Sequence, residues 1–297
     1  MDLSAFSNYL TDQLKKNIQI ESAHSVSGGD IHQAYQLQTN IGNLFLKLNN
    51  EEAQPLFATE ARSLHAINQS HSIRSPKALG HGIFANQAWL LMEYLPLTSQ
   101  GDDLQRGYDL AKMHQHINQA PQPFGWFEDN FIGHTLQKNQ WHFSWVDFYA
   151  NQRLLPQLEL SQINGAQRAL YDYGLELITA LPYWFENYQP QASLLHGDLW
   201  AGNSAFIKQE TLNQAVIYDP ASYYGDRETD LAMSELFGGF SPAFYQGYNQ
   251  LYPIDKGYQK RKPLYNLYHL LNHYNLFGGH YQSQALRTIQ QLLQQAN

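Results

Sequence analysis

Hydrophobic and polar positions in the first hundred residues change period twice. Phe6, Leu10 and Leu14 recur at helical steps and predict an amphipathic first helix. From Ser25 onward the period shortens to two, and Leu44-Phe45-Leu46-Lys47-Leu48 is typical of a strand. The order is strand, glycine turn, strand, turn, strand, so we expect a small antiparallel sheet behind the first helix.

Lys47 is the one charged residue inside that predicted strand, on the opposite face from Leu46 and Leu48. An exposed edge lysine is the default interpretation. In the next segment, apolar residues from Phe57 onward recur at steps of three and four and include Glu60 on their face. A buried carboxylate needs a partner, so we expect Glu60 to pair with Lys47.

A hinge is predicted where the apolar run 89–92 ends in Glu93-Tyr94-Leu95-Pro96, because the proline favours leaving the sheet. Helical patterns dominate from Trp141 onward. We therefore expect an α+β protein of two lobes, a small N-lobe (1–94) with an antiparallel sheet and one main helix and a larger, mostly helical C-lobe (95–297).

Composition narrows the class of protein. A chain of 297 residues with 43% hydrophobic residues can bury the cores of two lobes. The 18 basic and 26 acidic residues give a net charge of −8, which argues against nucleic acid or an anionic membrane as a partner. The sequence has no basic leader, no apolar run of about 18 residues and no cysteine, so we expect a soluble, cytoplasmic protein without disulfides or thiol chemistry.

The strongest chemical signal lies between residues 195 and 221. His196-Gly197-Asp198 is followed by Asn203, and Asp219 follows two apolar runs that predict a hairpin. An acid, an amide and a second acid in this order are typical of phosphoryl transfer. Asp198 would orient a substrate hydroxyl, while Asn203 and Asp219 would supply hard oxygen ligands for Mg²⁺. Each acid alone is more often a turn residue or a helix cap.

The same chemistry requires a nucleotide site, and ATP and Mg²⁺ are the predicted cofactors. The pair Lys47 and Glu60 would hold the α and β phosphates. Gly28 and Gly29 would either let main-chain amides approach phosphates or form only a turn. The hinge residues expected at the adenine, chiefly through their main chain, are Met92, Glu93, Tyr94 and Leu95.

Several features leave two interpretations open. Trp200 either lies against a sugar ring or seals the core. The loop 125–133 is either a packing plug or a substrate wall. Asp230 either belongs to a solvated turn and helix cap or braces the catalytic loop through buried hydrogen bonds.

Metal and hydrolase chemistry have weaker support. His269 and His273 lie at an i, i+4 spacing but lack the glutamate of a zinc-protease motif, which favours a packed pair over a zinc site. Serines near His196 suggest a nucleophilic triad, but none of them lies in a nucleophile elbow. They are Ser193, Ser204 and Ser222.

Taken together, blocks along nearly the whole chain resemble the fructosamine kinases, also called ketosamine-3-kinases. The first of these blocks are Gly28-Gly29-Asp30-Ile31-His32-Gln33-Ala34-Tyr35, Leu46-Lys47, Glu60-Ala61, Met92-Glu93-Tyr94 and His196 to Asn203. Those particular to the family are Gly125-Trp126, Asp129 to Gly133, Asn139-Gln140-Trp141, Phe237-Gly238-Gly239-Phe240 and Leu271-Asn272-His273. The wider aminoglycoside phosphotransferase group does not usually carry the Trp200 block or the later ones.

This resemblance implies a protein-kinase-like fold and transfer of the ATP γ-phosphate to the 3-hydroxyl of a ketosamine, whose unstable product releases the amine and so leads to deglycation. Asp198 would be the base, and Trp200, Trp126 and His269 would be candidate substrate contacts. The substrate would be a small-molecule or protein-attached fructosamine, ribulosamine or erythrulosamine. Some members carry a glycine-loop cysteine that can link two chains, but Asp30 stands there in this chain. Monomer and homodimer both remain open.

Two other functions compete with this one. An aminoglycoside or choline-type kinase would use the same chemistry on another cationic substrate. A pseudokinase acting as a binding module would be expected to lose Lys47, Asp198, Asn203 or Asp219, and all four are present.

Overall fold

The computed structural model describes residues 2–26, 32–208 and 213–296. The chain forms two compact units, one of Met1–Gly101 with Ala205–Asp219 and one of Asp102–Ser204 with Pro220–Asn297. The hairpin 205–219 belongs to the first unit because β10 (Ser204–Ile207) pairs antiparallel with β6 (Leu97–Thr98). The predicted N-lobe (1–94) differs from this first unit because it lacks the hairpin 205–219. The predicted boundary after residue 94 stays a prediction about functional lobes.

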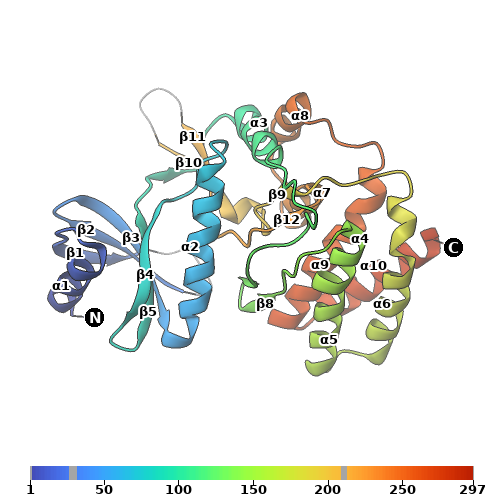
Figure 1. Cartoon of the computed structure of the whole chain (residues 1–297), viewed down its shortest axis with the longest axis horizontal. Helices are drawn as coiled ribbons and strands as arrows, with labels where there is room; N and C mark the ends of the chain where they lie inside the picture. Colours follow the sequence, from blue (N-terminus) through green and yellow to red (C-terminus); the bar gives the residue numbers. More distant parts are fainter. Residues whose placement is uncertain (1, 27–31, 209–212, 297) are drawn as a thin grey trace. The chain divides into compact units, whose positions relative to one another are not determined.

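The first unit is built on an antiparallel sheet in the order β1-β2-β3-β5-β4 (Figure 1). Strands β1 to β3 confirm the predicted succession of strands, while the glycine turn between the first two lies outside the described residues. A second sheet has the order β11-β10-β6, which confirms the predicted hairpin before Asp219. The elements not yet given are α1 (Leu3–Leu14), β1 (Ile20–Ser25), β2 (Gln33–Thr39), β3 (Gly42–Asn50), η1 (Glu51–Ala53), α2 (Gln54–Gln69), β4 (Ala78–Phe84), β5 (Gln87–Glu93) and β11 (Gln214–Ile217).

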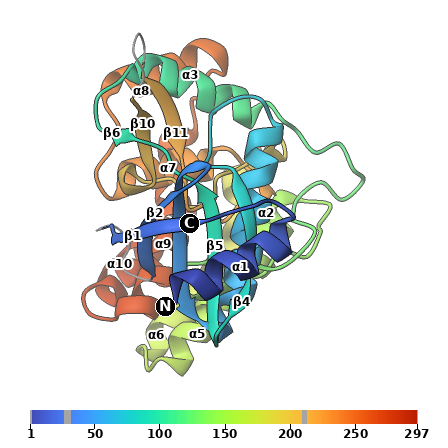
Figure 2. The same ribbon diagram turned by 90° about the vertical axis from the view of Figure 1, so that its left-hand side faces the viewer.

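Helices α1 and α2 cover opposite faces of the five-stranded sheet, as Figures 1 and 2 show. Side chains alternate along β3, so Leu46 packs with Phe6 of α1 while Phe45 packs with Phe57 of α2. Each face thus has its own apolar cluster. Lys47 lies on the α2 face, and the two-residue period of β3 therefore brings it to the helix that carries Glu60.

The second unit is mostly helical and has two short strand pairs, β7 with β8 and β9 with β12. Among the residues that the structure describes, no helix combines the length and apolarity needed to cross a membrane. The elements are α3 (Asp103–His114), β7 (Asn130–Ile132), β8 (Thr135–Gln137), α4 (Trp145–Phe148), η2 (Tyr149–Leu154), α5 (Leu155–Ile163), α6 (Arg168–Ala180), η3 (Leu181–Phe185), β9 (Ser193–Leu194), η4 (Ala201–Asn203), β12 (Tyr224–Gly225), α7 (Glu228–Leu236), α8 (Pro242–Leu251), α9 (Tyr258–Phe277) and α10 (Tyr281–Ala296).

Helices α3 and α8 approach each other closely because each has a glycine at the contact. A Cβ added to Gly107 would lie 1.8 Å from the carbonyl oxygen of Phe244, and one added to Gly247 would lie 1.9 Å from that of Leu104. Neither backbone could accept a side chain there. This contact brings the end of α3 beside Tyr248 of α8, which matters for the site.

Candidate active site

Lys47 makes two ion pairs within the first unit. Its Nζ lies 2.7 Å from Oε1 of Glu60 and 2.6 Å from Oδ1 of Asp219. Lys47 and Glu60 are each 7% exposed. The structure therefore contains the expected pair, and Lys47 is not an exposed edge lysine.

The local charges keep this group ionised. Burial lowers the pKa of Lys47, but the carboxylates of Asp219 and Glu60 outweigh it, so the pKa lies above its ordinary value. Burial raises the pKa of Glu60 to about 6, while the neighbouring ammonium opposes that rise. At neutral pH, Lys47 is thus a fixed cation held by two carboxylates.

Asp219 has an unusual backbone conformation directly after β11. Its φ is +59°, in the left-handed region that non-glycine residues rarely adopt. The hairpin is anchored to the rest of the unit by the N–H of Ile217, which donates to the carbonyl of Arg74 at 3.0 Å. The Asp219 side chain remains 43% exposed while it contacts Lys47. Strain of this kind is typical of functional positions, where a particular side chain is needed despite its backbone cost.

At the predicted hinge, Glu93 is tied to the sheet by its side chain. Both carboxylate oxygens accept hydrogen bonds from Arg74 at 2.7 Å, and its N–H donates to the carbonyl of Lys77. Beyond it, among the described loops, turns and caps, the N–H groups of Tyr94 and Leu95 make no main-chain hydrogen bond.

The other expected nucleotide contacts differ in their placement. Met92 is buried in the apolar cluster between the sheet and α2, and its position in β5 pairs with Phe45 of β3 and Ala78 of β4. Gly28 and Gly29 lie outside the described residues, as does Asp30.

In the second unit, Asp198 and Asn203 lie together. The Nδ2 of Asn203 donates to the main-chain carbonyl of Asp198 at 3.0 Å and to its carboxylate at 3.3 Å. The amide oxygen of Asn203 is thereby turned away from these contacts. The N–H of Asp198 donates to Nδ1 of His196 at 3.2 Å, which helps to fix the turn before it.

Asp230, in the first turn of α7, braces this loop by accepting hydrogen bonds from its main chain. Its two carboxylate oxygens accept the N–H of His196 at 2.7 Å and that of Gly197 at 2.9 Å. Asp230 is 1% exposed, and its Oδ2 also lies 3.1 Å from Nε2 of His114. Of the two interpretations of Asp230, the structure supports the buried brace.

The protonation of this cluster follows from its hydrogen bonds. Burial pushes the pKa of Asp230 upward, but the hydrogen bonds from His114 and from the N–H of Gly197 outweigh it and hold the pKa below its ordinary value. Burial lowers the pKa of His114, which is therefore neutral at pH 7. An ionised carboxylate only accepts, so Nε2 of His114 carries the proton and Nδ1 accepts from the hydroxyl of Tyr248 at 2.7 Å.

His114 and Tyr248 were not identified from the sequence. They lie 134 residues apart in the chain, and each lies on a helix whose pattern predicts only packing. The need of a buried carboxylate for hydrogen-bond donors could have pointed to His114 and Tyr248. A buried Asp230 requires donors, and a histidine at the end of an otherwise apolar helix face is a candidate donor.

Buried amides at the end of the loop 125–133 form an amide plug, while Phe127 in the same loop is 59% exposed. Asn130, 1% exposed, donates to the carbonyl of Ser222 at 2.8 Å, and Gln137 donates to that of Ala221 at 3.0 Å. Asn139 in turn donates to Asn130. These buried amides fix the segment that follows Asp219-Pro220. Gln137 was missed because its role depends on this tertiary contact.

The three candidate substrate contacts differ in exposure. Trp200 is 39% exposed, and its ring lies over Gly202, where an added Cβ would meet it at 2.2 Å. Trp126 is 3% exposed and packs against Tyr224 with ring centroids 5.4 Å apart. His269 is 3% exposed. Only Trp200 thus presents a broad surface to a ligand.

The candidate metal ligands among the described residues are side-chain oxygens rather than histidine nitrogens. Within those described residues, no cluster of three histidine, aspartate or glutamate side chains could hold a metal ion. Nδ1 of His273 hydrogen-bonds the carbonyl of His269, as in a packed pair. The carboxylate of Asp219 in the first unit and the amide oxygen of Asn203 in the second are each oxygen ligands of the kind that Mg²⁺ prefers.

The fold is shared with solved phosphotransferases. A presumed fructosamine-3-kinase from Haemophilus somnus superposes with a TM-score of 0.84 at 29% identity, covering 97% of this chain and 96% of that one. A thermostable mutant of the aminoglycoside phosphotransferase APH(4)-Ia superposes with a TM-score of 0.59 at 15% identity, covering 97% and 98%. The protein is therefore a phosphotransferase of the protein-kinase-like fold, which confirms the predicted fold class.

Sequence comparison defines the family. Residues 3–295 match the fructosamine kinase family. A probable ketoamine kinase of Vibrio parahaemolyticus is 42% identical over 97% of this chain and 98% of its own length. A chloroplastic protein-ribulosamine 3-kinase of Arabidopsis thaliana is 40% identical over 94% of this chain and 84% of its own length. The chain belongs to the fructosamine kinase family, and the resemblance inferred from its motifs is confirmed.

The brace at Asp230 can be tested by Asp230→Asn. The amide keeps the size of the side chain but replaces one acceptor oxygen with a donor, which cannot satisfy the N–H of both His196 and Gly197. We expect the free energy of unfolding to fall by about 2–3 kcal/mol and the Gly197 amide to exchange faster with solvent. Denaturant titration and hydrogen exchange measure these effects. Asp172→Asn, at an exposed ion pair, is the control and should change stability little. If Asp230→Asn left both the free energy of unfolding and the exchange rate of the Gly197 amide unchanged, Asp230 would not brace this turn.

His269 makes stability depend on pH. Burial lowers its pKa from 6.5 to about 3, so below pH 6.5 the unfolded chain takes up a proton that the folded chain refuses. The stabilising contribution is present above pH 6.5 and is lost as the pH falls. Between pH 7.5 and 5 we expect His269 to account for a loss of about 2 kcal/mol.

The check is denaturant unfolding across this pH range for the parent chain and for His269→Gln, in which this part of the pH dependence should disappear. His280→Gln replaces an exposed histidine and should keep the parental slope. Equal slopes in all three proteins would show that His269 titrates normally in the folded chain.

Proposed function

We propose that this protein is a ketosamine-3-kinase, which transfers the γ-phosphate of ATP to the 3-hydroxyl of a sugar joined to an amine. The observation that carries the proposal is Lys47, a buried cation fixed by Glu60 and by Asp219, the acid expected to bind magnesium. Family membership supports the chemistry, and relatives named as ketoamine and ribulosamine kinases support the substrate class. The product would release its amine, so the biological outcome would be deglycation.

The nucleotide would be held mainly by the first unit. Lys47 would contact the α and β phosphates, with Glu60 keeping its ammonium in place. Gly28 and Gly29 would cover the phosphates, and the main chain from Met92 to Leu95 would meet the adenine. ADP is bound in a ternary complex of the aminoglycoside phosphotransferase that shares this fold, which supports ATP as the donor. As functional lobes, residues 1–94 would bind the nucleotide and residues 95–297 would carry the catalytic loop and the substrate pocket.

In the proposed transfer, Asp198 accepts the proton of the sugar 3-hydroxyl as that oxygen bonds to the γ-phosphorus. The bond from this phosphorus to the bridging oxygen breaks, and ADP leaves. Asn203 and Asp219 would hold Mg²⁺, which neutralises charge on the phosphates when bound. The brace from Asp230 keeps the turn before Asp198 in one conformation, so the carboxylate is oriented before substrate arrives.

The sugar would lie against Trp200, whose exposed ring follows Asp198 by two residues. An aromatic face binds the C–H groups of a sugar while its hydroxyls remain available for hydrogen bonds. Trp126 and His269 would act on the substrate only indirectly because both are buried. We expect the protein to be cytoplasmic. Both a monomer and a homodimer are compatible with the proposed function.

The function is tested by supplying MgATP with fructosamine, ribulosamine and erythrulosamine adducts, beside kanamycin and choline, and measuring ADP and the phosphorylated product. We expect turnover of at least one ketosamine and little of the other two acceptors. Asp198→Asn should lower kcat by about 100-fold or more, since it removes the proton acceptor, and should keep the fold and nucleotide binding.

Asp172→Asn is the matched control for that variant and should keep parental turnover, because its carboxylate lies on the surface in the pair with Arg168. Near-normal turnover by Asp198→Asn would reject its assignment as the base. Absence of turnover with every ketosamine would reject the proposed substrate class.

Trp200→Ala tests the sugar contact. We expect the KM for the ketosamine to rise about five- to tenfold, the usual value of one aromatic contact, while the KM for ATP stays unchanged. Phe143→Ala removes another exposed aromatic ring, 70% exposed in the same unit, and should leave both constants unchanged. Equal KM values for Trp200→Ala and the parent would exclude a sugar contact at Trp200.

A further inference from the structure

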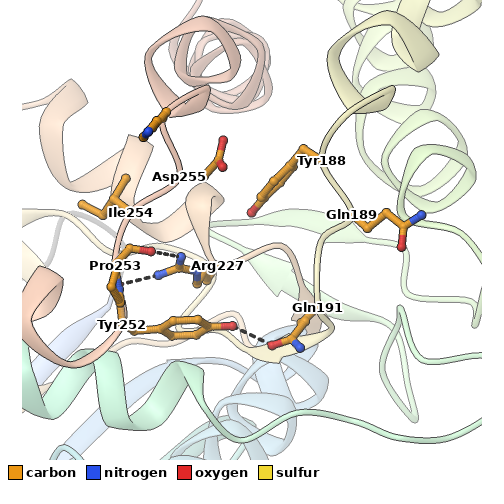
Figure 3. Close-up of a pocket in the computed structure, with 9 residues that line it drawn as sticks. Tyr188, Gln189, Gln191, Arg227, Tyr252, Pro253, Ile254 and Asp255 are labelled. Atoms are coloured by element: carbon orange, nitrogen blue, oxygen red, sulfur yellow. Dashed lines mark hydrogen bonds between the residues drawn. The ribbon is translucent and has the colours of Figure 1, made fainter.

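The second unit contains a pocket of about 530 Å³ whose lining takes no part in the proposed reaction (Figure 3). Its volume lies within the usual range for sites that bind small molecules, roughly 300–1,000 Å³. The walls combine aromatic, apolar and amide side chains with two cationic ones, Arg227 and Lys256, and one carboxylate, Asp255. The aromatic and apolar side chains are Tyr188, Tyr252, Pro253 and Ile254.

Arg227 is a buried cation at this pocket, only 7% exposed. Its guanidinium lies over the ring of Tyr252, 3.5 Å from the centroid, and donates to the carbonyls of Tyr252 and Pro253, as Figure 3 shows. Its remaining hydrogen-bond partner is the hydroxyl of Tyr248. All of these partners are neutral, so no carboxylate is hydrogen-bonded to this charge among the described residues.

The nearby carboxylates are held by other groups. Asp255 in the lining accepts from Arg261 and from the N–H of Gly257. Glu228 is bound by two nitrogens of the same Arg261, at 2.7 and 2.9 Å. Asp226 accepts from the hydroxyl of Tyr188 at 3.0 Å. Among the described residues, the pocket therefore offers an anion one buried guanidinium whose hydrogen bonds go to neutral groups, with Glu228 acting on it only through the electrostatic field.

The rest of the lining adds a second cation and an apolar wall. Lys256 is exposed and makes no ion pair with any residue that the structure describes. Pro253, Ile254 and the ring of Tyr188 supply apolar surface. Two positive charges beside such a surface suit a small molecule that carries one anionic group on an apolar body.

Hydrogen bonds connect this pocket to the catalytic loop without interruption. Arg227 donates to the hydroxyl of Tyr248 at 3.2 Å, and that hydroxyl donates to Nδ1 of His114 at 2.7 Å. Nε2 of His114 donates to Asp230 at 3.1 Å, and Asp230 accepts the N–H groups of His196 and Gly197. An anion that draws Arg227 toward the pocket would weaken its bond to Tyr248, and the change would pass along the same donors and acceptors.

We propose that this pocket is a regulatory site for a small carboxylate or phosphate anion on an apolar body, linked to the catalytic loop through Arg227, Tyr248, His114 and Asp230. The links lie within one compact unit. The proposal concerns binding and a structural response of the loop, so it holds or fails independently of the substrate assigned above.

The test uses amide NMR signals of the full chain titrated with benzoate and, separately, phenyl phosphate. Benzyl alcohol is the neutral control of similar shape. We expect at least one anion to bind about tenfold more tightly than the alcohol and to shift the amides of Ile254 and Lys256 at the pocket. The amides of His196 and Gly197, which donate to Asp230, should shift with the same dissociation constant.

Two comparisons separate anion binding at the pocket from the response of the catalytic loop: Lys256→Gln against Lys260→Gln, and Tyr248→Phe against the parent chain. Lys256→Gln should weaken anion binding about threefold at low ionic strength, while Lys260→Gln, an exposed lysine outside the lining, should not. Tyr248→Phe keeps the ring but removes the linking hydroxyl, so pocket signals should still respond to the anion and the His196 and Gly197 signals should not.

Two results would overturn the proposal. No preference of the parent chain for either anion over benzyl alcohol would exclude an anion site. Equal loop shifts in the parent and Tyr248→Phe would show that the link does not pass through this hydroxyl. If benzoate binds and phenyl phosphate does not, or the reverse, the result assigns the anionic group and supports the site.

Discussion

The burial of the Asp230 carboxylate constrains the arrangement of the helical unit around it. A carboxylate that is 1% exposed must be given hydrogen-bond donors, and the chain supplies them from three places: the turn before Asp198, the end of α3 and, through Tyr248, helix α8. The catalytic turn is thus ordered by the same interactions that make the buried charge tolerable. The close glycine contact of α3 with α8 brings the last of these partners within reach.

The two units treat charge in opposite ways. In the first, a buried cation, Lys47, is surrounded by carboxylates, and in the second a buried anion, Asp230, is surrounded by N–H donors. Both arrangements leave one carboxylate partly exposed, Asp219 in the first and Asp198 in the second. These two partly exposed acids are the ones to which we assign roles in the proposed phosphoryl transfer; Lys47 contacts Asp219 directly, and Asp230 holds the turn that precedes Asp198.

Sequence patterns predicted what depends on neighbours in the chain. The period of two in β3 and the helical steps of α2 were enough to pair Lys47 with Glu60, and the hairpin before Asp219 followed from two apolar runs. They could not predict His114, Tyr248 or the amide plug at Asn130, whose partners lie 92 to 134 residues away. The contact of His114 with Tyr248 is set by the packing of α3 on α8, which depends on the space left by glycines such as Gly107. The contact at Asn130 joins β7 to a distant loop, and neither contact follows from a local period.

The left-handed backbone at Asp219 has a consequence for how this position can vary. Glycine would adopt a φ of +59° without strain, and asparagine would do so at lower cost than most residues. Each of these would lack the negative charge that contacts Lys47, however, and a buried ammonium that loses an ion-pair partner is destabilised. The turn therefore restricts this position to a residue that tolerates a positive φ and also carries a carboxylate, and aspartate meets both requirements.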